Sequence, residues 1–192
     1  YVWEDSALNQ RPIYPVEMAA VIQEYLTGIF STASYLINRH LEYLTEANGL
    51  TILTTQTQDD SNVYPKITIN PLPYQTKYLP SSQDAGLRTE IGPVQLSGTA
   101  SQILVGACQL TLSGNNRYEM HQLLTEIQLL FLRDRKMFMR ELNLASLTPE
   151  RAQIQGKDQV GASVSSGPNY RQSIVIRWTT VWAPMLWTEN TF

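Results

Sequence analysis

The 192-residue sequence is short of the residues on which most protein chemistry depends. It contains one cysteine, Cys108, so no internal disulfide can form, and two histidines, His40 and His121. Charged residues make up only 16% of the chain, the formal net charge is -3, and the pI is near 5.4. A free-standing nucleic-acid-binding protein usually has a basic excess, because phosphate contacts provide most of its affinity. The composition therefore argues against that class and indicates a largely neutral-polar surface.

Long apolar runs are missing as well. No stretch approaches the roughly 18 residues that a membrane-spanning helix needs. Residues 1–10, YVWEDSALNQ, lack the basic and then apolar pattern of a signal peptide. We therefore expect a soluble protein in a reducing compartment, with no membrane partner. The length suits a single domain, 1–192, in which residues 1–15 form an extended arm or a frayed terminus.

The best candidate for a phosphate-binding loop is LTLSGNNRYEMHQLL, which runs from Leu110 to Leu124. It has one glycine, Gly114, and lacks the lysine, the second glycine and the hydroxyl of a Walker loop. The three glycines of a dinucleotide-binding fingerprint are also missing. Asn116 is a favourable helix N-cap, and Glu119 follows three residues later, as in a capping box. We interpret this turn as the start of a helix.

The remaining reactive residues do not form a catalytic or metal-binding pattern. His40 falls on the apolar stripe of a helix, which predicts a partly buried structural histidine, and His121 falls on a polar face. Neither has an aspartate, glutamate or cysteine at metal-ligand spacing. Cys108 lies in the middle of a strand and is interpreted as a small core residue. We predict no catalytic residue, cofactor or metal and no enzyme, although an enzyme or binding domain without a recognisable motif stays open.

Two long helices are predicted from apolar residues spaced three and four apart. The first runs over Val16–Ala47 and ends at the Asn48-Gly49 pair, because glycine accepts the left-handed cap conformation. The second begins after Asn116 and continues to about Leu142. The apolar positions are Ile22, Tyr25, Leu26, Ile29, Phe30, Ala33, Leu36, Ile37, Leu41 and Leu44 in the first helix, and Met120, Leu123, Leu124, Ile127, Leu130 and Phe131 in the second.

The strands are predicted from β-branched and alternating segments. Leu50–Thr57 and Val63–Ile69 flank a polar turn and suggest a hairpin. Ser101–Leu112 is apolar on both alternating faces, which indicates a strand that is central or covered on both sides. Residues 151–167 suggest an irregular strand pair, and Tyr170–Trp187 is a strong strand that Pro184 ends. We therefore predict an α+β fold, with two long helices packed on a mostly antiparallel mixed sheet.

Residues 70–93 are predicted to form a long irregular loop. Loops of this length inside a compact domain are usually functional or disordered. This one carries Tyr74, Tyr78 and Leu79 and is too apolar for a simple linker, so we expect it to pack on a neighbouring subunit or partner, with disorder as the alternative. The four prolines of the segment are Pro71, Pro73, Pro80 and Pro93.

Two further groups are candidates for a partner contact. Arg133, Arg135 and Lys136 lie late in the second helix, where cations favourably oppose the helix dipole. The alternative is that they form ion pairs with a neighbouring subunit or face passing DNA. For the C-terminal tryptophans Trp178, Trp182 and Trp187, core packing is the default interpretation. Trp187 follows Pro184, beyond the end of the last strand, so a partner contact is the alternative, since tryptophan is enriched at protein interfaces.

The order of these elements resembles the tail-terminator (tail-completion) and related neck proteins of long-tailed bacteriophages. The resemblance rests on the strand–turn–helix QILVGACQLTLSGNNRYEMHQLLTEIQLLF and the closing strand RQSIVIRWTTVWAP. It covers the order of elements over about Val16–Trp182. The family has no catalytic or binding signature, so it assigns no role to any residue here.

The resemblance implies a structural protein of the virion, assembled in the host cytoplasm. It implies a homo-oligomeric ring, expected to be a hexamer, that caps the tail tube and joins it to the head connector. The implied partners are tail tube and sheath proteins and head connector or adaptor proteins, with DNA only as passing cargo. A portal adaptor, or another neck or baseplate ring protein, is the alternative within this class. A small soluble enzyme or binding domain is the alternative from another class.

Overall fold

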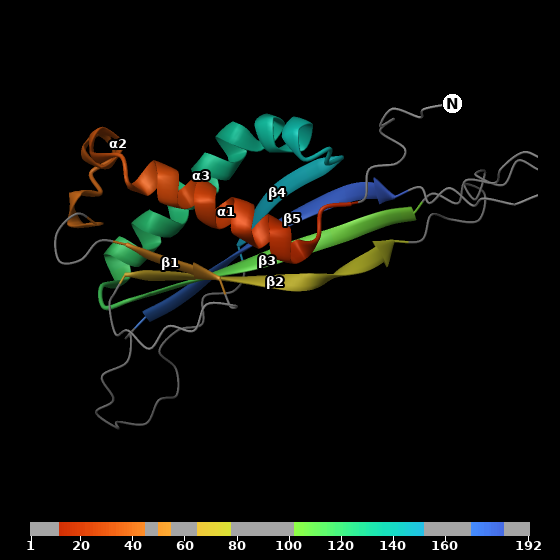
Figure 1. The fold of residues 1–192 in the computed structure, drawn as a ribbon. Coiled ribbons are helices and arrows are strands. Elements are labelled where there is room, and N and C mark those ends of the chain that lie inside the picture. The colour runs from red at the N-terminus through yellow and green to blue at the C-terminus, as the bar shows by residue number, and fades with distance from the viewer. Residues whose placement is uncertain (1–11, 45–49, 55–64, 78–101, 152–169, 183–192) are drawn as a thin grey trace, which may run out of the picture.

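The computed structural model describes residues 12–44, 50–54, 65–77, 102–151 and 170–182. Within these ranges the protein has an α+β fold, in which the helices cover one face of a five-stranded sheet (Figure 1). The strand order across the sheet is β1-β2-β3-β5-β4. The elements are α1 (Pro15–Phe30), α2 (Ala33–Asn38), the 3-10 turn η1 (Glu42–Leu44), β1 (Thr51–Thr54), β2 (Lys66–Lys77), β3 (Gln102–Gly114), α3 (Arg117–Glu141), β4 (Ser146–Arg151) and β5 (Tyr170–Trp182).

The sheet is mixed and mostly antiparallel, as the sequence predicts. β2, β3, β5 and β4 are antiparallel neighbours, whereas β1 and β2 are parallel, with Thr51 opposite Lys66. The predicted hairpin between the first two strands is therefore wrong. Parallel pairing places Ile52 beside Ile67, and the side-chain amide of Gln23 on α1 donates to the Ile52 carbonyl at 3.0 Å. β1 therefore lies parallel to β2 and in contact with α1, a strand direction that the polar turn residues do not specify.

β2 continues through residues that the sequence assigns to a loop. Its pairing with β3 extends to Lys77, so the predicted loop over 70–93 is wrong for residues 70–77, and the remainder lies outside the described residues. Pro71 and Pro73 are tolerated because β1 pairs with β2 only as far as Ile69. Beyond that point β2 has no described neighbour on the β1 side, and a strand with one open side tolerates residues that lack an N–H donor. A register shift between Leu72 and Gln75 marks a bulge.

The first predicted helix is interrupted. α1 ends at Phe30, where the hydroxyls of Ser31 and Thr32 both donate to the Gly28 carbonyl, at 2.9 and 3.1 Å. The short helix α2 follows and turns the chain back, so the prediction of one helix over residues 16–47 is wrong. The apolar spacing still identifies core residues on both sides of the break, namely Ile22, Leu26, Phe30, Leu36, Leu41 and Leu44.

His40 is exposed and does not occupy the partly buried position predicted for it. Its φ of 56° places it in the left-handed region, two residues after the last residue of α2. The N–H of Leu41 donates to the Leu36 carbonyl at 2.8 Å, and the N–H of His40 donates to the Ile37 carbonyl at 3.2 Å. These two bonds form a Schellman motif, in which the left-handed residue points away from the core. His40 therefore reverses the chain.

α3 begins where the sequence predicts. The side-chain oxygen of Asn116 accepts from the N–H groups of Tyr118 and Glu119, at 2.9 and 3.4 Å, which confirms it as the N-cap. The helix ends at Glu141, within one residue of the predicted end. Asn143, two residues after the end of the helix, has a φ of 52°. The chain then enters β4, a strand that was not predicted from the sequence. The irregular strand pair predicted beyond it lies outside the described residues.

The core lies between the helices and β3 and β5. β3 is the central strand of the five, as predicted, but the described helices cover only one of its faces. Along β3, Leu104, Cys108, Leu110 and Leu112 are buried beneath the helices, whereas the alternate residues from Ile103 to Thr111 are half-buried. The chain therefore presents one helical surface and one sheet surface.

Candidate interaction surfaces

Four of the seven predicted contact residues lie in the described ranges, and Tyr74 is on a different element from the other three. Tyr78, Leu79 and Trp187 lie outside the described residues. Tyr74 belongs to β2, and the basic residues lie on α3.

Tyr74 is a packing residue and not a free contact residue, which corrects the prediction. It lies within the β2 bulge, half-buried, with its ring edge-on to Trp178 at a centroid distance of 6.1 Å. Its hydroxyl accepts from the Trp178 indole N–H at 3.0 Å and donates to the Ile13 carbonyl. Burial raises the pKa of Tyr74. The side chain thereby ties the segment before α1 to the sheet.

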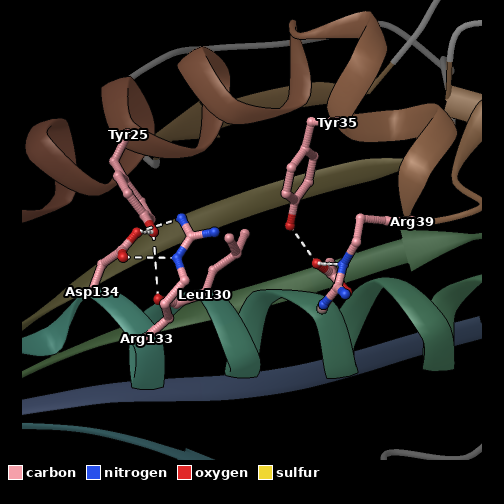
Figure 2. Close-up of polar contacts among 7 residues, drawn as sticks. Tyr25, Tyr35, Arg39, Leu130, Arg133 and Asp134 are labelled. Atoms are coloured by element: carbon pink, nitrogen blue, oxygen red, sulfur yellow. Dashed lines mark hydrogen bonds and ion pairs between the residues drawn. The ribbon is translucent and has the colours of Figure 1, made fainter.

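Arg133, the first residue of the basic run, is already paired. Its guanidinium donates to both carboxylate oxygens of Asp134, at 2.8 and 2.6 Å, and the Tyr25 hydroxyl donates to the same carboxylate at 2.6 Å (Figure 2). The hydrogen bonds from Arg133 are the main reason that the pKa of Asp134 is lowered. Arg133 therefore belongs to the contact between α1 and α3.

Arg135 and Lys136 are exposed and make no ion pair with any described residue. Arg133 and Arg135 are two positions apart, so they lie on nearly opposite flanks of α3, with Lys136 between them on the outward side. The basic run is thus not a single patch that could hold DNA or a large acidic partner. Only Lys136 faces away from the sheet.

Leu129 and Leu132 accompany Lys136 on this outward side. Each leucine is 45% exposed, although both lie in a helix with a well-formed buried face. We call Leu129, Leu132 and Lys136 the outer face of α3. The sequence reasoning missed the two leucines because it followed only the core stripe. The sequence does contain a signal for these two leucines, because they are apolar residues that lie outside the apolar stripe of the helix.

Three tyrosine hydroxyls attach the N-terminal helical segment to α3. Besides Tyr25, the hydroxyl of Tyr35 donates to the buried carboxylate of Glu126, and that of Tyr43 donates to the Glu119 carbonyl at 3.2 Å. Arg39 also donates to Glu126, at 2.7 Å (Figure 2). The pKa values of all three tyrosines are raised, mainly by burial.

The sheet face opposite the helices is neutral and polar over the half where β3 ends, whereas Ile103, Val105 and Ala107 make the other half more apolar. In the registered strands, Thr68, Thr111 and Ser173 form one row across this face. The next row places Asn70 and Gln109 beside the partly exposed Val175. A charged pair, Arg177 with Glu150 at 3.2 Å, lies toward the β4 edge. The middle of this face can therefore form hydrogen bonds with little net charge.

Several chain exits gather at one end of the sheet, which we call the exit end. Lys77 is registered with Ile103, and Gln102 with Trp182, so the end of β2, the start of β3 and the end of β5 are adjacent (Figure 1). The bond from Tyr74 to Ile13 brings the segment before α1 to the same end. Residues 1–11, 78–101 and 183–192 therefore all attach there.

His121 lies in an open recess beside the first turn of α3. It measures about 750 Å³, and its lining includes Arg117, Tyr170 and Gln172. The side-chain oxygen of Gln172 is buried and has no hydrogen-bond partner among the described residues. The recess offers cations, aromatic rings and amides, but no arrangement of a nucleophile with a base.

The described residues include no group of three or more histidine, cysteine, aspartate or glutamate residues arranged to hold a metal ion. Cys108 is fully buried, and burial raises the pKa of its thiol to about 12, which disfavours the reactive thiolate. Within the same ranges, none of the helices has the length and apolar character needed to cross a membrane. No family model matches the chain, and no curated protein sequence is similar to it.

Proposed function

We propose that the protein is a structural protein in the neck of a long-tailed bacteriophage, a tail terminator that assembles into a ring of six identical subunits. The ring caps the tail tube, contacts tube and sheath proteins on one side and the head connector on the other, and lets DNA pass through its centre. The protein acts through shape and surface complementarity, without a cofactor, and its place is the virion.

The proposal rests on one observation, that several segments of the chain leave the fold together at the exit end of the sheet. A head-to-tail ring needs two different patches on each subunit, one that reaches out and one that receives. Residues 78–101, which carry Tyr78 and Leu79, leave and re-enter the fold at the exit end. The outer face of α3 lies on the helical layer and exposes two leucines beside Lys136. One subunit therefore has two dissimilar surfaces suited to a heterologous contact.

The polarity of the protein supports the same function. The sheet face opposite the helices offers threonine, asparagine and glutamine side chains, which can dock a neighbour through hydrogen bonds. The net charge of -3 opposes the phosphate backbone of DNA, whose retention would need a cationic surface. A ring with these properties would let DNA pass without binding it.

The test is the stoichiometry of the purified chain, alone and with tail tubes, by sedimentation and negative-stain electron microscopy. We expect rings with six times the 21.8 kDa of one chain and a hole wide enough for DNA. Twelve-fold rings would contradict a terminator and indicate a portal adaptor. A monomer that persists at high concentration with tubes present would overturn the neck function, and a ligand screen at the recess beside α3 would follow.

A matched pair of variants identifies the surface that receives the neighbour. Leu129→Asp combined with Leu132→Asp places charge on the outer face of α3, where both side chains are already exposed, so the fold should persist and the ring should be lost. Ile37→Asp alters an apolar side chain that is 58% exposed on α2 and should leave the ring intact. Equal loss of the ring in both would exclude the outer face of α3 as the contact.

A further inference from the structure

The recess beside the first turn of α3 has a floor from β5 and a wall from α3. Tyr170 and Gln172 are two positions apart on β5, so both lie on the sheet face that the helices cover. Arg117 and His121 are four positions apart on α3, so they lie on one side of the helix. All four residues line the same opening of about 750 Å³, a size that is typical of small-molecule sites.

Gln172 is the residue of this recess that requires a ligand. It is only 3% exposed, and its side-chain oxygen is buried without a hydrogen-bond partner among the described residues. A buried acceptor is costly to leave unpaired, and such groups in native proteins are usually satisfied. Because Gln172 lines the recess, a molecule bound there can donate an N–H or O–H group to this oxygen.

The charges around the recess favour an anion. The side chains of Arg117 and His121 are exposed and have no ion pair or hydrogen bond with another described residue. None of the described residues in the lining is an aspartate or a glutamate, although the net charge of the chain is -3. A phosphate at this end of α3 would meet the Arg117 guanidinium and the positive end of the helix dipole.

An exposed aromatic ring stands beside these cations. Tyr118 is 76% exposed, more than any other large apolar or aromatic side chain among the described residues. It follows Arg117 directly and precedes His121 by three positions, so it borders the same side of α3. A ring of this kind next to a cation is a surface on which a nucleic-acid base can stack.

A nucleotide carries all the groups that the recess complements. Its phosphate suits Arg117, its planar base suits Tyr118, and a base N–H suits the Gln172 oxygen. Glutamine pairs with adenine in particular, because its oxygen accepts from the exocyclic amino group while its amide donates to a ring nitrogen. A carboxylate or a sulfate would satisfy the cations but would leave the Gln172 oxygen unpaired, since it has no donor.

We propose that the recess beside the first turn of α3 binds a mononucleotide whose base carries an exocyclic amino group, as adenine does. The amino group donates to the Gln172 oxygen, the base stacks on Tyr118 and the phosphate contacts Arg117. The nucleotide is bound and not transformed, because the described lining has no nucleophile arranged with a base. This inference does not depend on the proposed ring.

The test is calorimetric titration of the full chain with adenosine monophosphate and with inosine monophosphate. The two differ at one position of the base, where inosine has a carbonyl oxygen in place of the amino group. We expect saturable binding of one adenosine monophosphate per chain and about tenfold weaker binding of inosine monophosphate, because two acceptors would face each other at Gln172. Equal affinities, or no binding of adenosine monophosphate, would overturn the proposal.

Three further probes separate the parts of the ligand. Inorganic phosphate and adenosine each lack one half of it, and we expect both to bind about tenfold or more weakly than adenosine monophosphate. Phosphate that binds as tightly would reduce the recess to a simple anion site. A single-stranded adenine oligonucleotide that binds more tightly would indicate a nucleic-acid surface. Either result would overturn a mononucleotide site.

Gln172→Met separates ligand binding from a structural role. Methionine has a similar length and no oxygen to leave unpaired, so the unfolding temperature should stay the same or rise. The preference for adenosine over inosine monophosphate should disappear in this variant. A preference that survives would show that the Gln172 oxygen does not read the base, and it would overturn the proposal.

Arg117→Ala and Arg171→Ala form a matched pair. Both arginines are exposed, but Arg171 is next to Gln172 on β5 and therefore points to the opposite face of the sheet. We expect Arg117→Ala to weaken adenosine monophosphate binding by about tenfold and Arg171→Ala to have little effect. Equal losses would mean general charge attraction and would overturn the site. Ring formation, measured by sedimentation, is a separate result, so either proposal can fail alone.

Discussion

Trp178 occupies the space that a side chain at residue 106 would need. A Cβ built on Gly106 would lie 2.3 Å from the Cε2 atom of Trp178, which is fully buried and registered directly opposite on β5. Tyr74 holds the indole in place by accepting its N–H at 3.0 Å. Because Gly106 has no side chain, the core has room for Trp178, its largest fully buried residue.

We expect Gly106→Ala to destabilise the fold by about 1–3 kcal/mol or more, because the methyl group must displace a buried ring system. The free energy of unfolding in urea measures the effect. Gly114→Ala is the matched control, since its Cβ would meet the Sδ atom of Met120 at 2.6 Å, at the end of a flexible side chain. Equal losses would contradict the role assigned to Trp178.

Removal of the α3 cap should be measurable on its own. Asn116→Ala leaves the N–H groups of Tyr118 and Glu119 without their side-chain acceptor, and we expect a loss of about 1 kcal/mol in the free energy of unfolding. Asn115→Ala changes the preceding exposed asparagine and should have little effect. If the two variants lose the same stability, residue 116 does not act through the cap.

The Asp134 carboxylate should make stability fall in acid. Its pKa is lowered in the folded protein below the ordinary value of 3.8, mainly by hydrogen bonds from Arg133. The stabilisation is therefore present above pH 3.8 and is lost as the pH falls through the folded pKa. Asp134→Asn should remove this part of the acid dependence in urea unfolding. Glu141→Gln, at an exposed pair, should retain it.

The buried tyrosines should make stability fall in alkali. The pKa of Tyr43 is raised above its ordinary value of 10.0, mainly by burial, so the unfolded chain releases this proton first. Its contribution is fully present below pH 10.0 and is lost as the pH rises toward the folded pKa. Tyr43→Phe should reduce the slope of stability against pH above 10. In Tyr118→Phe, at a side chain that is 76% exposed, the part of the slope that comes from Tyr43 should largely remain.

Local chemistry allowed several features to be predicted from the sequence. The turn before α3 was identified correctly because Asn116 is a helix cap wherever its oxygen reaches the first free N–H groups. The spacing of Leu36, Leu41 and Leu44 correctly marked buried residues, even though the helix through them is broken. Apolar spacing reports which residues face the core, and this information survives a change in backbone path.

The candidate contact residues were harder to predict, for a physical reason. Tyr74 was expected in a loop because the segment 70–93 holds four prolines. A strand with one open side tolerates proline, and the bulge places the Tyr74 ring against Trp178. Arg133 looked like a free cation, but a tyrosine from α1 completes its pair with Asp134. In both cases the deciding partner is distant in sequence.

The sequence by itself determined the α+β composition, the start of α3, the central position of β3 and most of the residues that face the core. These depend on capping, periodicity and β-propensity, which act over a few neighbouring residues. Only the tertiary structure decided the parallel pairing of β1 with β2, the passage of β2 through its prolines and the closure of α1 onto α3 by tyrosines. Strand direction and side-chain partners are set by contacts between segments far apart in the chain, and no local pattern records them.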